Sequence, residues 1–398
     1  MVLAVPLVID DAQGLASMIY DVIVVGAGLA GCSAAIQLAQ AGWQVLLLEQ
    51  QRYPAHKLCG EFLSVEVIAN FARLGVLEAV QQIGAHPIHR ALVTTAAGAN
   101  FAQDLPGTAL GLSRFQLDSI LFRRAAAVGA ICCDRTTVRQ IEGNLDTGFS
   151  VRTTQGTFQS RAVLAAYGKR STLDTQLDRP FTHRPSPWVA FKAHCTGLDL
   201  PGTIELHAFP GGYCGLSAIE TGQINLCWIG HRKILQDADD PNLPDVLHAN
   251  PVLHERLSHL SYGHAQKHRL RQISFALKGN FDGDICMLGD TAGMITPLCG
   301  DGMAMALRTA ELATPLVDTF LKRELTAVHF KQQYQTLWRR EFQSRLQLGR
   351  MLHAGFIQPQ LAHISVGLCQ MFPTMAAWVI RNTRGATSEE QPTMQIVG

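Results

Sequence analysis

The sequence predicts a mixed α/β fold, in which a parallel-sheet unit is interrupted by an inserted antiparallel sheet and followed by a helical C-terminus. Three observations favour this class. A strand–helix–strand pattern occupies residues 20–49, short strands separated by turn signals fill 188–230, and helical patterns dominate from Gly302 onward. A chain of 398 residues is also too long for one average core, so two closely packed domains are expected.

The opening unit consists of two buried strands and one helix. Tyr20–Val25 is a short apolar run that ends in glycine, as a buried parallel strand does. Leu29–Ala41 is small and apolar and is followed by Gly42, a typical residue after a helix. Gln44–Glu49 is the second buried strand, and the short connections predict a β-α-β unit.

The middle of the chain changes from helices to strands. Two helices are expected at Ser64–Val80 and Arg114–Gly129, and a hairpin is expected around Gln155-Gly156. Four further strands are separated by glycine-containing turns, which is typical of an antiparallel sheet. These strands are Trp188–Cys195, Thr203–Phe209, Tyr213–Ile219 and Gln223–Gly230.

The last third returns to the first pattern. Asp284–Leu288 is a buried strand, Gly302–Leu321 a helix, and 324–367 further helix. We therefore expect one domain that is built from three separate segments of the chain, with a second domain inserted in it. A helical region is expected at the C-terminal end, and residues 1–17 are expected to form an extension outside the fold. The segments of the first domain are 18–85, 110–175 and 280–325; the inserted domain comprises 86–109 and 176–279, and the helical end is 326–398.

Composition excludes several classes of function. The net charge is +1, without the basic field that a nucleic-acid-binding protein needs. Ten scattered cysteines without a C-x-x-C pair indicate a reducing, cytoplasmic location. The apolar stretch Met1–Val8 lacks the basic residues of a signal peptide. His264 and His268 stand four residues apart in a histidine-dense region, but no acid lies at a ligand spacing, so a polar helix is favoured over a metal site.

A glycine pattern follows the first strand. Gly26 permits the sharp turn, Gly28 leaves room for a pyrophosphate, and Gly31 lets helix and strand pack closely. Leu29 and Ala30 then begin a helix whose free amides and dipole favour an anion. Glu49 ends the next strand, followed by Gln50, where a carboxylate accepts hydrogen bonds from a ribose. The sequence therefore predicts a Rossmann-type dinucleotide site.

A second motif identifies the dinucleotide. In the stretch DICMLGDTAGMITPLCGDGMAMA, Gly289-Asp290 ends a strand, and Gly300 and Gly302-Met303 open a helix. The stretch resembles the second FAD segment of the p-hydroxybenzoate-hydroxylase-fold superfamily, which includes aromatic monooxygenases, flavin halogenases and geranylgeranyl reductases. The resemblance implies FAD as the cofactor, with Asp290 on ribityl or ribose hydroxyls. The helix start at Gly302 would then face the flavin pyrimidine edge, where its dipole stabilises a reduced flavin.

A third segment, HKLCGEFLS at 56–64, is similar to the geranylgeranyl reductase branch in particular. The resemblance implies that Lys57 touches the pyrophosphate and that Cys59 and Gly60 lie beside the flavin ring. For Cys59 a small buried hydrophobic residue is an equal alternative. Arg114 is expected to contact FAD, and Asp118 to be its structural partner.

Two departures from the superfamily pattern leave the reaction open. Tyr167 stands where the monooxygenases carry an aspartate before Gly168. The stretch Gly211–Ser217 lacks the tryptophans of the halogenases. Of the Tyr-x-Trp-x-x-Pro run typical of the geranylgeranyl reductases it has only Tyr213, which either faces the substrate or is a half-buried strand tyrosine.

The expected function is an FAD-dependent oxidoreductase, first an NAD(P)H-dependent monooxygenase acting on a lipophilic or phenolic small molecule. Reduction of isoprenoid double bonds is the first alternative, and prenyl carriage without catalysis the second. No catalytic acid or base is identified, and the flavin would supply the chemistry. Leu361–Ile380 is nearly uncharged, and either packs on the core or makes peripheral contact with a membrane.

Overall fold

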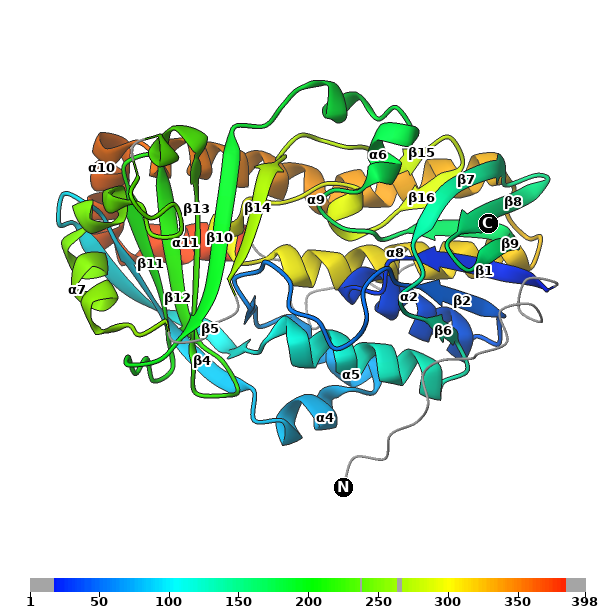
Figure 1. The fold of residues 1–398 in the computed structure, drawn as a ribbon, viewed down its shortest axis with the longest axis horizontal. Coiled ribbons are helices and arrows are strands. Elements are labelled where there is room, and N and C mark those ends of the chain that lie inside the picture. The colour runs from blue at the N-terminus through cyan, green and yellow to red at the C-terminus, as the bar shows by residue number, and fades with distance from the viewer. Residues whose placement is uncertain (1–17, 237, 263–266, 384–398) are drawn as a thin grey trace.

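The computed structural model describes residues 18–236, 238–262 and 267–383. The predicted extension at 1–17 lies outside these residues. Two eight-stranded sheets lie at opposite ends of the molecule, with α8 and α9 between and behind them (Figure 1). The predicted mixed α/β class with a second sheet and a helical C-terminus is confirmed.

The first sheet has the order β15-β16-β9-β1-β2-β6, and β7 and β8 extend it antiparallel from β9. Its central strands pair in parallel, and β2 (Val45–Leu48) is buried at every position, as a strand covered on both faces must be. The remaining strands are β1 (Ile19–Val25), β6 (Ile131–Cys133), β7 (Val138–Asn144), β8 (Gly148–Thr153), β9 (Gly156–Ala165), β15 (Phe281–Asp282) and β16 (Ile285–Met287).

The second sheet has the order β14-β10-β13-β12-β11-β4-β5-β3. Its pairs are antiparallel, as predicted for the four strands of the middle region, except that β11 lies parallel to β4. A parallel pair needs a long connection, and the chain between β4 and β11 supplies one. The strands are β3 (Phe62–Leu63), β4 (His86–Thr94), β5 (Asn100–Gly111), β10 (Trp188–Cys195), β11 (Thr203–Phe209), β12 (Gly212–Ala218), β13 (Ile224–His231) and β14 (His268–Ile273).

Helices pack on the first sheet, and α10 and α11 at the C-terminal end contact the second sheet. They are α2 (Leu29–Gln40), α3 (Val67–Leu74), α4 (Leu77–Gln82), α5 (Arg114–Ala127), α6 (Thr172–Gln176), α7 (Pro251–His259), α8 (Gly302–Leu321), α9 (Ala327–Phe356), α10 (Pro359–Met371) and α11 (Pro373–Asn382). Short 3-10 turns include η4 (Gly289–Thr291) and η5 (Pro297–Cys299).

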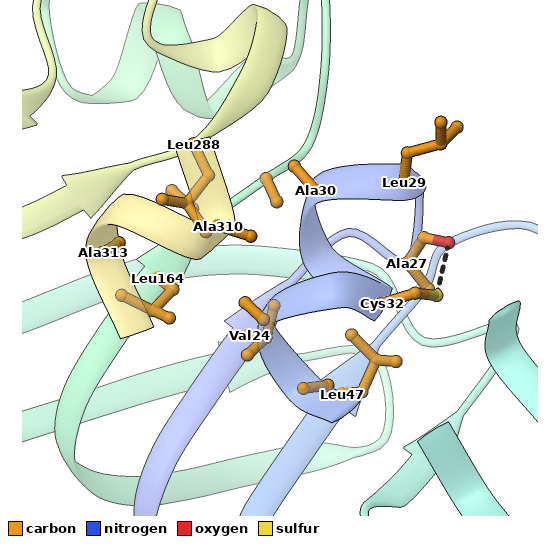
Figure 2. Packing of buried hydrophobic residues seen from close by; sticks show 14 of the residues in the cluster. Val24, Ala27, Leu29, Ala30, Cys32, Leu47, Leu164, Leu288, Ala310 and Ala313 are labelled. Atoms are coloured by element: carbon orange, nitrogen blue, oxygen red, sulfur yellow. Dashed lines mark hydrogen bonds between the residues drawn. The ribbon is translucent and has the colours of Figure 1, made fainter. Parts of the chain in front are cut away.

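The core of the first domain forms where α2 and α8 pack against each other and against the sheet (Figure 2). Small side chains such as Ala30 and Ala310 let the helices approach closely, while Val24 and Leu47 fill the sheet side. Cys32 is fully buried there, and its thiol donates a hydrogen bond to the Ala27 carbonyl at 3.1 Å. This packing fixes the start of α2.

Two predicted helices are interrupted. The expected helix Ser64–Val80 is split into α3 and α4, because Gly75 adopts a left-handed conformation with φ 69° and ends α3. The expected run 324–367 is also wrong as one helix. It ends at Phe356, and α10 begins at Pro359, since proline suits the first position of a helix but not its interior.

No single helix in the described part of the chain is long and apolar enough to cross a membrane. The pair α10 and α11 passes the same test only when taken together, and it is bent by 113° at its break.

Candidate functional site

A cavity of about 1060 Å³ lies between the two sheets. This is near the upper end of volumes for small-molecule sites, so it has room for a dinucleotide and part of a second ligand. All but one of the predicted site residues line it. They are Gly26, Gly28, Leu29, Ala30, Glu49, Gln50, Lys57, Cys59, Gly60, Arg114, Tyr213, Gly289, Asp290, Gly300, Gly302 and Met303.

The exception is Gly31, which lies behind the cavity wall. A Cβ at Gly31 would stand 1.9 Å from the Gly26 carbonyl oxygen, so any side chain would force strand and helix apart. Gly26 itself has φ 99°. Gly28 caps α2 and faces the cavity, and a Cβ there would meet only Arg114 Nη2, at 3.6 Å. The turn thus leaves a space above Gly28 that a side chain would fill, which fits a pyrophosphate on the helix start.

Glu49 is held by backbone amides at the rim of this turn. One carboxylate oxygen accepts from Ala27 N and the other from Gln51 N, both at 3.0 Å. The side chain is buried yet reaches the cavity. The predicted contact of Glu49 with a ribose therefore stays a prediction, with the carboxylate already oriented by two amides.

Lys57, Arg114 and Asp118 form a charged cluster next to the glycine turn. Arg114 donates two hydrogen bonds to Asp118, at 2.7 and 2.8 Å, and Lys57 Nζ lies 3.1 Å from the same carboxylate. Burial alone would raise the pKa of Asp118, but Arg114 and Lys57 hold that pKa below its usual range. Lys57 Nζ also lies 3.6 Å from Glu49, so two cations face two carboxylates, with Lys57 and Arg114 beside Gly28 on the cavity wall.

The second glycine motif lies on the same cavity. Gly289 (φ 56°) and Gly300 (φ 67°) both adopt left-handed conformations that other residues rarely take. The Gly289 amide donates to Thr309 Oγ1 at 2.9 Å, which ties the turn to α8. Gly302 begins α8 at the cavity wall. Two helix starts, α2 and α8, therefore face one space, and the residues present fit an extended dinucleotide anion.

Sequence reasoning missed a buried ionic group formed by Glu61, Lys192 and His194. His194 Nε2 lies 2.6 Å from Glu61 Oε2, and Lys192 is bonded to Glu61 Oε1. Glu61 Oε1 also accepts from the Arg114 amide at 2.7 Å, at the start of α5. Burial would raise the pKa of Glu61, but His194 and Lys192 hold that pKa below its usual value. The signal was present, because a lysine and a histidine alternate on one face of an otherwise apolar predicted strand.

His56 and His268 stand next to this group and face the cavity. The His56 ring lies 5.3 Å from the ring of His194 and stacks on Phe115 at 4.7 Å. Burial, followed by the charge of Lys192, lowers the pKa of His56 to about 4. His56 is therefore a neutral imidazole at physiological pH. His268 lies in β14 rather than on the predicted helix, so that expectation was wrong; His264 lies outside the described residues.

A second missed group holds the loop that contains Tyr167. Arg179 is fully buried, pairs with Asp174 at 2.9 Å and donates to the carbonyls of Thr291 and Lys278. Tyr167, at the position of the superfamily aspartate, donates to the same Asp174 at 2.9 Å. Lys278 Nζ bonds the carbonyls of Lys169 and Asp290, and burial lowers its pKa to about 8. Tyr167, which stands where the monooxygenases carry an aspartate, is thus hydrogen-bonded into the buried network of Asp174 and Arg179.

Tyr213 is buried on β12 and lines the cavity. Its ring makes edge contacts with His353 and Phe356 of α9. The Tyr213 side chain is therefore buried, not half-buried as one of the two sequence-based alternatives proposed. Within the described ranges, no three metal-ligating side chains gather. All ten cysteines are free.

The cavity continues beyond the glycine motifs into an apolar region. Its walls there come from β4, β5 and β11 on one side and from α10 and α11 on the other. Val93, Phe101 and Leu206 of the sheet line this region, as do Ile364 and Val379 of the helices. This region has the character of a site for an apolar chain.

The chain matches the family model described as FAD binding domain over residues 19–319. It is 25% identical over 315 residues to the menaquinone reductase of Mycobacterium tuberculosis, covering 75% of this chain and 76% of the relative. It is 26% identical over 345 residues to digeranylgeranylglycerophospholipid reductase 2 of Methanopyrus kandleri, covering 82% and 83%.

Among solved structures, the fold matches a myxobacterial chondrochloren halogenase, an FAD-dependent enzyme, with a TM-score of 0.73. The sequence identity is 19%, and the match covers 93% of this chain and 94% of the other. The predicted superfamily and cofactor are thereby confirmed. The chain belongs to the FAD binding domain family, within the p-hydroxybenzoate-hydroxylase-fold superfamily, and is an FAD-dependent oxidoreductase.

Proposed function

We propose that this oxidoreductase reduces carbon–carbon double bonds in an isoprenoid lipid, with NAD(P)H as the electron donor. The observation that carries the proposal is the apolar region of the cavity, which leads from the glycine motifs to α10 and α11. A compact phenolic substrate would not need this length of apolar wall. The two relatives named above support the same class, because both are named as reductases of isoprenoid-bearing molecules.

Bound FAD would supply the two-electron chemistry, and the chain would supply position and charge. Lys57 and Arg114 would hold the pyrophosphate above Gly28, and Asp290 the ribityl or ribose hydroxyls. The dipole at the start of α8 would favour negative charge on the reduced ring. His56 and His268 would border the substrate on the cavity wall as neutral imidazoles, since burial lowers the pKa of both.

The proposal is tested without oxygen. The flavin is reduced with one equivalent of dithionite under argon, and then a geranylgeranyl lipid is added in detergent. We expect reoxidation of the flavin and a product heavier by two hydrogens for each double bond reduced. Monooxygenation, the function expected first from the sequence, requires O₂. A flavin that stays reduced with the geranylgeranyl lipid until oxygen is admitted would contradict the proposal and favour monooxygenation.

The electron donor is tested in the same apparatus. We expect NADH or NADPH to bleach the oxidised flavin bands under argon. The remaining alternative, carriage of prenyl groups without catalysis, is not supported, because the family and the relatives named above are redox proteins.

A further inference from the structure

Exposed apolar side chains gather on α10 and α11, some facing the cavity and others, such as Phe372 and Trp378, outside its lining. Eleven large hydrophobic side chains are exposed in the described residues, and six of them lie within positions 361–378. These six are Leu361, Ile364, Leu368, Met371, Phe372 and Trp378, which we call the apolar corner. Phe372 and Trp378 are 55% and 56% exposed. Such a concentration marks an interaction site, since scattered single side chains would not.

The charge pattern of the same segment is that of an interfacial helix. Residues 359–380 contain no Asp, Glu, Lys or Arg, and the exposed Arg381 follows directly. Aromatic and aliphatic side chains that enter a bilayer, next to a cation at headgroup level, are the arrangement of surface-bound amphipathic segments. A second copy of the chain fits this surface less well than a bilayer does. If two copies met through residues 359–382, Arg381 of one copy would find no acidic side chain in the same segment of the other.

The bend between α10 and α11 determines the shape of the apolar corner. α10 and α11 meet at 113°, with Met371 and Phe372 at the junction, and neither helix alone is long enough to span a membrane. Only Ala362, Val366 and Ala376 of these helices are buried against the protein. The corner is therefore shaped for shallow insertion rather than for crossing.

The same two helices line the cavity. Leu361, Ile364 and Leu368 of α10 belong to the apolar corner and also line the cavity. Val379 and Ile380 of α11 line the cavity beside them. A lipid that left the bilayer between α10 and α11 would thus remain in apolar surroundings. We propose that the apolar corner docks the enzyme on an anionic phospholipid bilayer and opens the cavity to it. The role as a substrate entrance rests on the proposed function, but docking itself does not.

The test is vesicle flotation of the flavin-loaded full-length chain, without substrate or turnover. We expect binding to vesicles of equal phosphatidylglycerol and phosphatidylcholine, and weaker binding to phosphatidylcholine alone. The double variant Phe372→Glu, Trp378→Glu should reduce the bound fraction about tenfold or more, since it places charge in the apolar layer. Val328→Glu, at an exposed position at the start of α9, is the matched control and should bind as the native chain does.

A second measurement reports the contact directly. Trp378 is the exposed tryptophan of the five, so brominated lipids should quench its share of the fluorescence and leave a Trp378→Phe variant unaffected. An unchanged flavin spectrum in every variant shows that the fold is intact. Docking is contradicted if vesicles never capture the chain, or if Val328→Glu abolishes capture equally. It is also contradicted if light scattering finds a dimer in lipid-free buffer that Phe372→Glu dissociates.

Discussion

At the scale of single residues, Gly28 and Gly31 have different tasks although they belong to one motif. A Cβ at Gly28 enters the cavity at an ordinary contact distance, whereas one at Gly31 collides with backbone. We therefore expect Gly28→Ala to fold normally but to bind FAD at least about tenfold more weakly, because the pyrophosphate loses its close approach. Gly31→Ala should lower the thermal midpoint of the apoprotein itself. Differential scanning fluorimetry and FAD titration separate the two effects, and equal loss of stability in both would contradict this division.

The buried ionic group makes a second prediction at this scale. Glu61→Gln leaves Lys192 almost completely buried without its anion, so the free energy of unfolding should fall by roughly 3–5 kcal/mol. Urea denaturation measures the change. Glu78→Gln removes an exposed carboxylate on α4 and should stay within about 0.5 kcal/mol of the native chain. A similar small effect for Glu61→Gln would mean that Lys192 is neutral or solvated.

His353 adds a pH dependence to stability. It is buried against Trp188 and Phe275, and neither ring nitrogen has a hydrogen-bond partner among the described residues. Burial lowers its pKa to about 4. Because the folded-state pKa lies below the unfolded value, the stabilisation is complete above about pH 6.5 and is lost as the pH falls toward 4.

The variant His353→Leu should therefore lose less stability between pH 7 and pH 5 than the native chain. The difference should be on the order of 2 kcal/mol in the free energy of unfolding. His363→Leu changes an exposed histidine on α10 and should keep the native slope. If the free energy of unfolding fell equally with pH in the native chain and in His353→Leu, protonation of His353 would not destabilise the fold and the prediction would be contradicted.

At the scale of elements, the sequence predicted those segments whose local signals agree with their packing. β10, β11 and α8 have the predicted bounds, because local signals mark their starts: Pro187 precedes β10, Pro201-Gly202 precedes β11, and Gly300 and Gly302 open α8. The break at Gly75 and the start of α10 at Pro359 were missed. Both interruptions fall inside runs of helical periodicity, and periodicity does not show whether a chain reverses at a glycine or proline.

The ion pair between Asp301 and Arg345 ties the start of α8 to α9. Both side chains are buried, and α9 also carries cavity residues such as Leu352. Arg345→Met should destabilise the chain by roughly 2–4 kcal/mol, because it removes the cation beside a buried carboxylate. It should also weaken FAD binding, since Gly302 follows Asp301. Arg340→Met on the exposed face of α9 is the control. Unchanged FAD affinity in Arg345→Met would show that the α8 start is held by other contacts.

At the scale of the whole molecule, the cavity exists because two sheets from interleaved segments enclose one space. Local motifs predicted the residues that approach the dinucleotide, such as Gly28 and Asp290. They did not predict the pair of Glu61 with Lys192, which are 131 positions apart and meet only through the fold. The alternating Lys192 and His194 mark one end of that group, but no local pattern connects them with Glu61.

The central claim is that the starts of α2 and α8 bind opposite parts of one FAD molecule. The most direct measurement is an FAD titration of the apoprotein of Gly302→Ala, followed by visible absorbance. A Cβ at Gly302 would stand 3.9 Å from Ile295, so the fold should tolerate it while the flavin end of the site is narrowed. Gly367→Ala on α10, where a Cβ meets nothing within 4 Å, is the control. We predict one FAD per native chain and at least about tenfold weaker binding in Gly302→Ala. A colourless native protein, or a Gly302→Ala variant with native FAD affinity, would contradict the account.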